Sequence, residues 1–222
     1  MKVYDVDRQI QNESNFPFWF SILKEADEVL DISKVKSVMD FGCGNGMFSQ
    51  LVNCKYPHLN IYGVEIDPSL VEFCNQNNQI STINFIHYNE MTLIKKIDVV
   101  FSQEVVYTQK SINMHAKEIF NVLNDGGYYI FTIGCHIDNP TWPKRRDKIR
   151  ASEKYFAFDY SLKDIADAFF NVGFRVTIKR LPLHVPIKYV PNDNGEFDNI
   201  VDMLNSCEEQ KTLFVMLKPK YK

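Results

Sequence analysis

The sequence predicts a doubly wound α/β domain with a mainly parallel, seven-stranded sheet and one antiparallel C-terminal strand. Short apolar runs alternate with helix-like segments from about residue 35 to residue 131, an order typical of a parallel sheet. Three glycines at alternate positions follow the first run, where strand turns to helix. A last apolar run follows the sixth strand after only a loop and a short helix, which favours antiparallel pairing.

Each expected strand is a short apolar run, and several are rich in Val, Ile, Phe and Tyr. Strands that are covered on both faces need apolar side chains on both faces. In chain order, the expected strands are Val35–Phe41, Asn60–Ile66, Ile83–Tyr88, Ile97–Ser102, Tyr128–Ile133, Phe174–Arg180 and Thr212–Leu217.

Helices are expected between these runs, where capping signals mark their ends. Pro68 stands at a first helical position, and the Asn-Asp-Gly-Gly sequence of residues 124–127 closes the helix before the fifth strand. Ser161 and Asp164 form an opening like a capping box, and Gly173 is a natural left-handed stop. The expected helices are Phe18–Leu30, Met47–Lys55, Ser69–Gln76, Ile112–Leu123, Ser161–Val172 and about Phe197–Cys207.

Charge and cysteine content argue against several classes of protein. A formal net charge of −3 gives no general attraction to nucleic acid or to an anionic membrane. Five scattered cysteines without a CxxC pair argue against disulfides and structural zinc, and fit reduced thiols in the cytoplasm. The N-terminus lacks a signal-peptide pattern, and no run approaches the ~18 apolar residues of a membrane span. The expected partner is a small molecule.

The strongest functional signal is the turn at residues 40–46, Asp-Phe-Gly-Cys-Gly-Asn-Gly, between the first strand and the next helix. Glycines there let the backbone turn tightly and approach a ligand closely. Glu65 stands 19 positions after Gly46, at the end of the second strand, where a carboxylate can accept both hydrogen bonds of a ribose diol. The run is neither the GxGxxG dinucleotide fingerprint nor a Walker loop, so it predicts an adenosine-type cofactor.

Residues 38–46 resemble motif I of the class I S-adenosylmethionine-dependent methyltransferases, and further landmarks follow in order to about residue 176. The resemblance implies a Rossmann-like fold, S-adenosyl-L-methionine as cofactor, S-adenosyl-L-homocysteine as product, and no metal. Asp40 is then expected near the methionine amino end, and Asn89 falls where the family usually has an Asp that binds the adenine amino group. The implied cofactor-binding residues are Asp40, Gly42, Cys43, Gly44, Gly46, Glu65, Ile66, Asn89, Glu90 and Gln103.

The resemblance also divides the single domain of residues 1–222 by role. We expect an N-terminal helical cap at residues 1–34, a cofactor-binding core at 35–134, and a substrate-shaping segment with the last two strands at 135–222. An aromatic-rich arm before the first helix is placed to close over a ligand. The family builds its acceptor pocket after the fifth strand, so the methyl acceptor is expected there.

His136, just past the fifth strand, is the preferred general base for an oxygen acceptor; its other interpretation is an exposed loop histidine. A neutral amine would need only positioning. His58, His87 and His115 are not expected at the carboxyl tip of a strand. A basic cluster at residues 144–150 is either a solvated helix face or a site that pairs with a phosphate or carboxylate of the substrate. Candidate substrate-binding residues are Trp19, Tyr107, Trp142, Arg145 and Arg146.

Two other functions stay open. One is methylation of protein or nucleic acid, although base-modifying members usually carry an Asn/Asp-Pro-Pro-aromatic segment after the fourth strand, where this chain reads Ser-Gln-Glu-Val at residues 102–105. The other is a catalytically silent subunit that binds the cofactor and supports a partner enzyme. The sequence does not determine the methyl acceptor or the oligomeric state.

Overall fold

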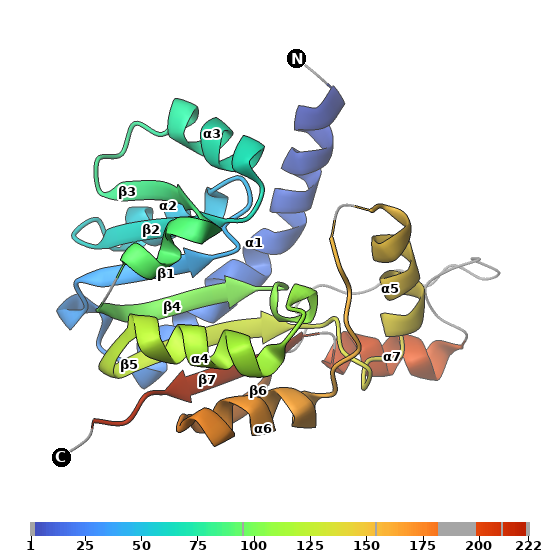
Figure 1. Ribbon diagram of the computed structural model, residues 1–222. Coiled ribbons are helices and arrows are strands. Elements are labelled where there is room, and N and C mark those ends of the chain that lie inside the picture. Colours follow the sequence, from blue (N-terminus) through green and yellow to red (C-terminus); the bar gives the residue numbers. More distant parts are fainter. Residues whose placement is uncertain (1–2, 95, 154, 182–198, 210, 221–222) are drawn as a thin grey trace.

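The computed structural model describes residues 3–94, 96–153, 155–181, 199–209 and 211–220. Among them, seven strands form one sheet in the order β3-β2-β1-β4-β5-β7-β6 (Figure 1). The strands are β1 (Ser37–Phe41), β2 (Asn60–Glu65), β3 (Ile83–His87), β4 (Ile97–Gln103), β5 (Leu123–Ile133), β6 (Arg175–Leu181) and β7 (Lys211–Leu217). Within these ranges, no helix is long and apolar enough to cross a membrane.

The strand β1 lies at the switch point of the sheet, between β2 and β4. The chain moves outward from β1 through β2 to β3 and then crosses back to β4 on the other side of β1. In sheets of this kind, ligands bind beyond the carboxyl ends of the strands at the switch point. The glycine turn that follows β1 occupies this position.

The strand β7 is antiparallel to both of its neighbours, whereas the other strand pairs are parallel. Phe131 of β5 lies opposite Phe214 of β7, and their rings stack with centroids 4.8 Å apart. The helix α7 (Ile200–Glu209) precedes β7 and returns the chain to the sheet. The predicted fold class is confirmed.

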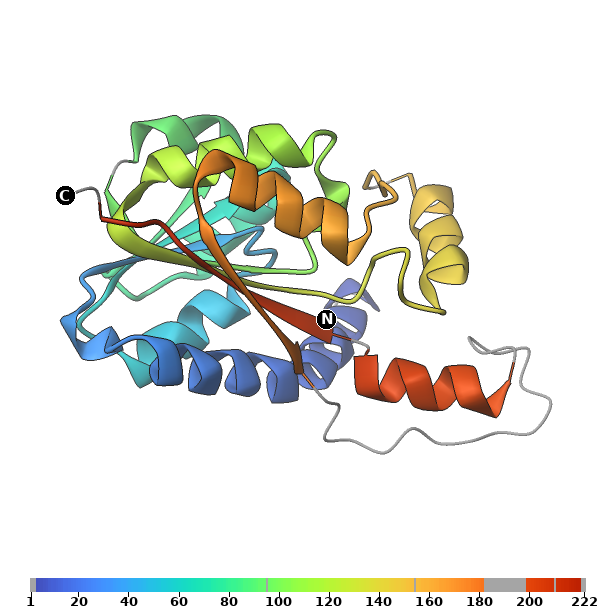
Figure 2. The ribbon, with the colours of Figure 1, turned by 90° about the horizontal axis from the view of Figure 1, so that it is seen from below.

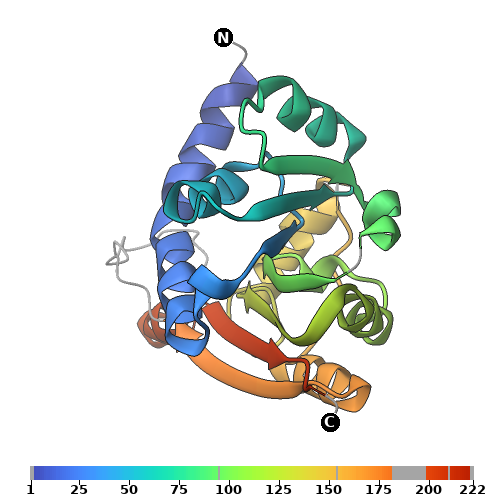
Figure 3. The same ribbon diagram turned by 90° about the vertical axis from the view of Figure 1, so that its left-hand side faces the viewer.

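Helices cover both faces of the sheet. One face carries α1 (Val3–Val29), α2 (Met47–Lys55) and α3 (Pro68–Asn77), and the other carries α4 (Ile112–Val122) and α6 (Leu162–Val172) (Figures 2 and 3). Because side chains alternate along a strand, the central strands contribute to two separate apolar cores. The helix α6 packs on one of these cores, and a capping box at its start and a left-handed glycine at its end define its limits.

Two helices, α5 (Trp142–Ala151) and α7, extend beyond the sheet. The basic cluster forms α5, which lies with α7 past the carboxyl ends of β4 and β5 (Figure 1). Three short 3-10 helices complete the described chain: Ile32–Lys34, Tyr88–Leu93 and Val106–Thr108.

Most strand boundaries lie within one or two residues of the expectation, and two elements differ by more. The helix α1 begins at Val3 and continues through Pro17, so the expected N-terminal arm is helical. The strand β5 begins at Leu123 rather than at Tyr128, because Leu123 already pairs with Ile97 and a bulge then takes up Gly126 at φ +82°. The first residues of the helix expected at 197–207 lie outside the described residues.

Candidate functional site

The turn after β1 is built from three glycines with positive φ. Gly42, Gly44 and Gly46 have φ values of +77°, +56° and +79°, a region that residues with a Cβ rarely adopt. A Cβ on Gly42 would lie 2.4 Å from a methyl of Val105, and one on Gly46 would lie 2.6 Å from the Phe85 ring. A Cβ on Gly44 would meet nothing within 4 Å. Packing therefore requires the outer glycines, whereas the middle one faces open space.

Glu65, at the end of β2, holds this turn. Its Oε2 accepts a hydrogen bond from the Gly44 N–H at 2.9 Å, and its Oε1 accepts from the N–H groups of Ile66 and Asp67 at 2.8 and 3.1 Å. The side chain is 6% exposed. A carboxylate has about four lone-pair sites, so Glu65 retains capacity to accept further hydrogen bonds at the edge of the open space.

Asp40 lies one layer deeper, inside β1. It is 3% exposed, and the Ser49 hydroxyl donates a hydrogen bond to its Oδ2 at 2.7 Å. Burial raises the pKa of Asp40 to about 7, since the Ser49 hydrogen bond only partly offsets the lost hydration and the Glu65 charge adds to the increase. The site therefore contains a carboxyl group that changes its charge near neutral pH.

The other expected cofactor-binding residues surround the turn. Cys43 is buried, and its hydrogen bond with the Cys74 thiol, together with burial, raises its pKa, so the thiol stays protonated. Ile66 is 62% exposed, and Gln103 is half-buried at the end of β4. Asn89 and Glu90 are exposed in the 3-10 helix that follows β3.

The structure corrects the expectation for His87, which is the last residue of β3 and so does lie at a carboxyl tip. Its Nδ1 accepts a hydrogen bond from the Asn89 N–H at 3.2 Å, and its Nε2 lies 2.9 Å from the Ile66 carbonyl oxygen. The histidine thus links two segments expected to contact the cofactor. Because the strand was expected to continue to Tyr88, His87 was not expected at its end.

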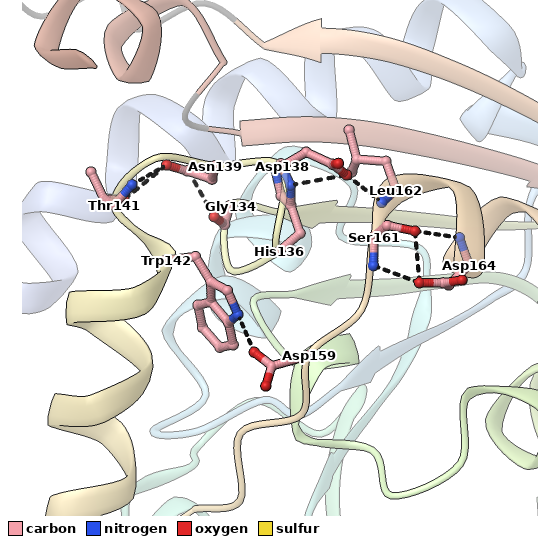
Figure 4. A network of polar contacts seen from close by, with 10 residues as sticks. All are labelled: Gly134, His136, Asp138, Asn139, Thr141, Trp142, Asp159, Ser161, Leu162 and Asp164. Atoms are coloured by element: carbon pink, nitrogen blue, oxygen red, sulfur yellow. Dashed lines mark hydrogen bonds and ion pairs between the residues drawn. The ribbon is translucent and has the colours of Figure 1, made fainter.

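His136 lies in the loop after β5 and is 1% exposed, so it is not an exposed loop histidine. Its Nδ1 is 3.8 Å from Oδ2 of Asp138, and that oxygen accepts a hydrogen bond from the Leu162 N–H at 2.8 Å (Figure 4). The loop and the start of α6 therefore enclose the imidazole together. Its role as a base stays a prediction.

The helix α5 is anchored through Asp159. This carboxylate accepts hydrogen bonds from Trp142 Nε1 at 2.8 Å (Figure 4), from Arg146 at 3.1 Å and from Arg150 at 3.3 Å. Trp142 is 1% exposed, and its ring lies 5.5 Å from that of Tyr107. Arg146 is thus engaged in holding α5 in place.

Tyr107 and Cys135 pack in one apolar cluster with Trp142 of α5, and Arg145 lies near enough for its charge to act on both groups. Burial raises the pKa of Tyr107, and the Arg145 charge opposes this increase. The same two effects act on the pKa of the Cys135 thiol. Trp19 lies elsewhere: it is 7% exposed and packs against Phe48 in the core beneath α1, with ring centroids 6.0 Å apart. The candidate substrate-binding residues thus have three different surroundings. Tyr107 and Arg145 lie near Cys135, whereas Trp142 and Arg146 anchor α5 and Trp19 packs in the core.

Sequence reasoning missed Glu104, the residue after β4. Its φ is +54°, its N–H donates to the Thr132 carbonyl at 3.0 Å, and its Oε1 accepts from the Gly134 N–H at 2.9 Å. Lys211, at the start of β7, places Nζ 3.6 Å from the same oxygen. No signal in the sequence reveals that residues 104 and 211 meet, because the contact depends on the order of the strands. The described residues contain no group of three His, Cys, Asp or Glu placed to hold a metal ion.

A family model described as "Methyltransferase domain" matches residues 32–177. The chain belongs to this methyltransferase family. The match confirms the resemblance seen in the glycine turn and assigns S-adenosylmethionine as the cofactor. The geometry fits that molecule, because the turn leaves open space at Gly44 and Glu65 lies beside it with free lone pairs.

Solved structures show the same fold in other methyltransferases. The methyltransferase solved with the Haloferax volcanii Trm112 methyltransferase activator is 16% identical, with a TM-score of 0.77 over 95% of this chain and 94% of that one. Phosphoethanolamine N-methyltransferase 2 of Haemonchus contortus, in complex with S-adenosyl-L-methionine, is 14% identical, with a TM-score of 0.64 over 91% of this chain and 53% of that one. These similarities support the fold of the methyltransferase domain.

Two of the curated relatives are also named as methyltransferases. Malonyl-[acyl-carrier protein] O-methyltransferase of Acetivibrio thermocellus is 21% identical over 157 residues, which cover 65% of this chain and 56% of that protein. Fatty-acid O-methyltransferase of Mycolicibacterium smegmatis is 23% identical over 113 residues, which cover 49% of this chain and 41% of that protein. This methyltransferase domain therefore spans about half the length of these relatives.

Proposed function

We propose that this chain transfers a methyl group from S-adenosylmethionine to an oxygen or nitrogen atom of a small molecule. The observation that carries the proposal is the glycine turn, where Gly44 faces open space while Glu65 holds its N–H. Any side chain at Gly44 would project toward that space. The net charge of −3 favours a small molecule over nucleic acid as the second substrate.

The cofactor supplies an activated methyl group, so the protein's main task is to position the acceptor in line with it; proximity and orientation are worth ~7–11 kcal/mol in such reactions. Glu65 would hold the ribose, and Asp40 would lie toward the amino end of the cofactor. Ile66 and the exposed pair at residues 89–90 would contact the adenine. On the acceptor side, Tyr107, Cys135 and Arg145 would border the reacting atom.

His136 is the proposed base for a hydroxyl acceptor. Its position beside Asp138 supports this role, because a carboxylate near one ring nitrogen orients the imidazole so that the other nitrogen can face the acceptor. An anionic group on the acceptor, such as a phosphate, would pair with Arg145. Arg146 is assigned to the anchoring of α5 instead, since Asp147 and Asp159 already engage its guanidinium.

A carboxylate oxygen is the second candidate acceptor. The names of the curated relatives, O-methyltransferases of a fatty acid and of malonyl-[acyl-carrier protein], suggest it. The observation in its favour is the buried cation of Lys211 at the acceptor end of the sheet.

Calorimetric titration with S-adenosylhomocysteine tests the cofactor site. We expect micromolar binding by the wild type and none by Gly44→Arg, whose side chain would fill the space beside the turn. Gly173→Arg is the matched control, because it introduces the same side chain at a positive-φ glycine that caps α6. A folded wild-type protein that does not bind S-adenosylhomocysteine would contradict the proposal.

Turnover is tested by S-adenosylhomocysteine formation from S-adenosylmethionine in the presence of a metabolite pool. Formation above the rate without the pool is the expected result. A protein that binds the cofactor tightly but never turns over would instead support the role of a silent subunit.

A further inference from the structure

Glu104 has a backbone conformation that glutamate rarely adopts. Its φ of +54° lies in the left-handed region, where a Cβ is disfavoured. The end of β5 fixes this conformation, because the Thr132 carbonyl accepts from the Glu104 N–H and the Gly134 N–H donates to Oε1. Backbone strain that is held by surrounding hydrogen bonds is concentrated at functional sites. The position of Glu104, at the carboxyl tip of the strand next to β1, is where such a site is expected.

A buried cation accompanies the carboxylate. Lys211 Nζ lies 3.6 Å from Oε1 of Glu104, and the two side chains are only 7% and 21% exposed. The same Nζ lies 4.1 Å from the centroid of the Phe18 ring on α1. Three segments that are distant in sequence, namely α1, the tip of β4 and the start of β7, therefore converge on this ion pair. A charge buried to this degree needs a partner of opposite sign, and Lys211 supplies it.

The second carboxylate oxygen of Glu104, Oε2, takes part in neither of the contacts made by Oε1. Oε2 of Glu104 is buried and accepts no hydrogen bond from an N–H or O–H group of the described residues. The adjacent Cys135 thiol is a weak donor; burial, the Glu104 charge and a side-chain hydrogen bond to Glu104 together raise the pKa of this thiol. A buried carboxylate oxygen served by no stronger donor than a thiol is costly, so a ligand that donates an N–H or O–H hydrogen bond to it gains affinity.

We propose that Glu104 binds the methyl acceptor directly, and that this acceptor presents an N–H or O–H group to Oε2. The inference rests on the proposed methyltransferase function and narrows its substrate class to amines and hydroxyl compounds. A carboxylate acceptor has no donor to offer at neutral pH, and the charge of Glu104 repels it. The cation of Lys211, which taken alone favours a carboxylate acceptor, is paired with Glu104, so the two side chains together present no net positive charge to a carboxylate.

The same hydrogen bond provides a base for the proton that the methyl acceptor must lose. The reacting form of the acceptor is the hydroxyl or the neutral amine, so an ammonium acceptor first gives one proton to water. The acceptor's lone pair would then form the new bond to the methyl carbon, and the carbon–sulfur bond would break with its electron pair remaining on sulfur. The hydrogen-bonded proton of the acceptor then moves to Oε2 of Glu104, which on this inference acts as the base in place of His136. Charge balances, because the positive charge lost at sulfur is matched by the negative charge lost at Glu104.

Three probes of equal chain length test the inference: octylamine, octanol and octanoate. Their binding is measured by calorimetry on protein saturated with S-adenosylhomocysteine, and their methylation by S-adenosylhomocysteine formation from S-adenosylmethionine. We expect the amine or the alcohol to bind and to be methylated, and octanoate to do neither. In Glu104→Gln, which keeps size and backbone preference but loses the charge, binding of the preferred probe should weaken at least tenfold. The affinity for S-adenosylhomocysteine should change less than twofold.

Glu153→Gln is the matched control, because Glu153 is also a glutamate with positive φ, at +56°, but is exposed after α5. It should leave both affinities unchanged. Methylation of octanoate in preference to the other probes, or an equal loss in both variants, would overturn the inference while leaving the proposed function intact. Failure of the wild type to bind S-adenosylhomocysteine would overturn both.

Discussion

At the scale of single residues, positive φ angles mark the tips of the two central strands. Gly42, Gly44 and Gly46 follow β1, and Glu104 follows β4. Glycine relieves the strain at the first tip, whereas hydrogen bonds from β5 hold the glutamate at the second. The two strand ends therefore differ in role: the glycine turn after β1 lets the backbone approach a ligand, whereas the end of β4 orients the side chain of Glu104.

The first glycine of the turn should be required for stability. Gly42→Ala would place a Cβ 2.4 Å from Val105, at a φ unfavourable for alanine. We expect a loss of about 2–3 kcal/mol in the free energy of unfolding, from overpacking and backbone strain together. Urea denaturation measures it. The double variant Gly42→Ala/Val105→Ala should cost less than the sum of the two single changes, and simple additivity would contradict the predicted clash.

Asp40 should make cofactor binding pH-dependent. Its pKa of about 7 means that it is largely protonated at pH 6 and largely ionised at pH 8. The ammonium group of S-adenosylhomocysteine favours the ionised form, so the complex releases a proton and affinity rises with pH. We expect about a tenfold rise between pH 6 and pH 8, levelling above it.

Calorimetry in two buffers of different ionisation enthalpy measures both the affinity and the proton release. Asp40→Asn should show neither the rise nor the release. A flat profile in the wild type, or the same rise in the variant, would rule out this role for Asp40.

At the scale of elements, two kinds of stabilisation operate after β5. The capping box of Ser161 and Asp164 and the glycine at 173 fix α6, and all three were read from the sequence because they are local. The helix α5 depends instead on Asp159, which lies beyond the end of the helix and receives one indole and two guanidinium groups. Local patterns cannot reveal such an anchor, since they do not show how the chain returns.

Loss of this anchor should loosen α5 alone. In Asp159→Ala, we expect amide hydrogen exchange across residues 142–151 to accelerate several-fold, because partly exposed ion pairs each contribute only ~0–1 kcal/mol and global stability changes little. The affinity for S-adenosylhomocysteine should stay the same. Asp167→Ala, which removes an exposed ion pair with Lys163 on α6, is the control and should leave α5 unchanged. Global acceleration of exchange would contradict a local anchoring role.

At the scale of the whole molecule, two buried titratable groups affect stability with opposite sign. His115 lies in the core between α4 and the sheet, with Nε2 3.1 Å from the Tyr129 hydroxyl, and burial lowers its pKa to about 3 from 6.5. The stability that follows from its neutral state is complete above pH 6.5 and is lost as the pH falls toward 3. The raised pKa of Asp40 acts in reverse, because its contribution is complete below pH 3.8 and is lost as the pH rises through 7.

The acid sensitivity due to His115 should appear when a variant is compared with the wild type. Between pH 7 and pH 5, the free energy of unfolding of the wild type should fall by about 2 kcal/mol relative to that of His115→Gln, which cannot gain a proton. Urea denaturation at the two pH values measures the difference. Asp40 is present in both proteins and cancels. Parallel pH profiles would show that His115 is protonated equally in the folded and unfolded states.

The sequence by itself determined the fold class, the order of the elements, the glycine turn and the cofactor. These depend on periodicity, capping and glycine spacing, which are local properties of the chain. The tertiary structure alone decided which side chains meet at the acceptor end. It enclosed His136 beside Asp138, assigned Arg146 to α5, and joined Glu104 to Lys211 across 107 residues of sequence. Such contacts depend on the order of strands in the sheet and on the return of the C-terminal strand, and no local pattern encodes either.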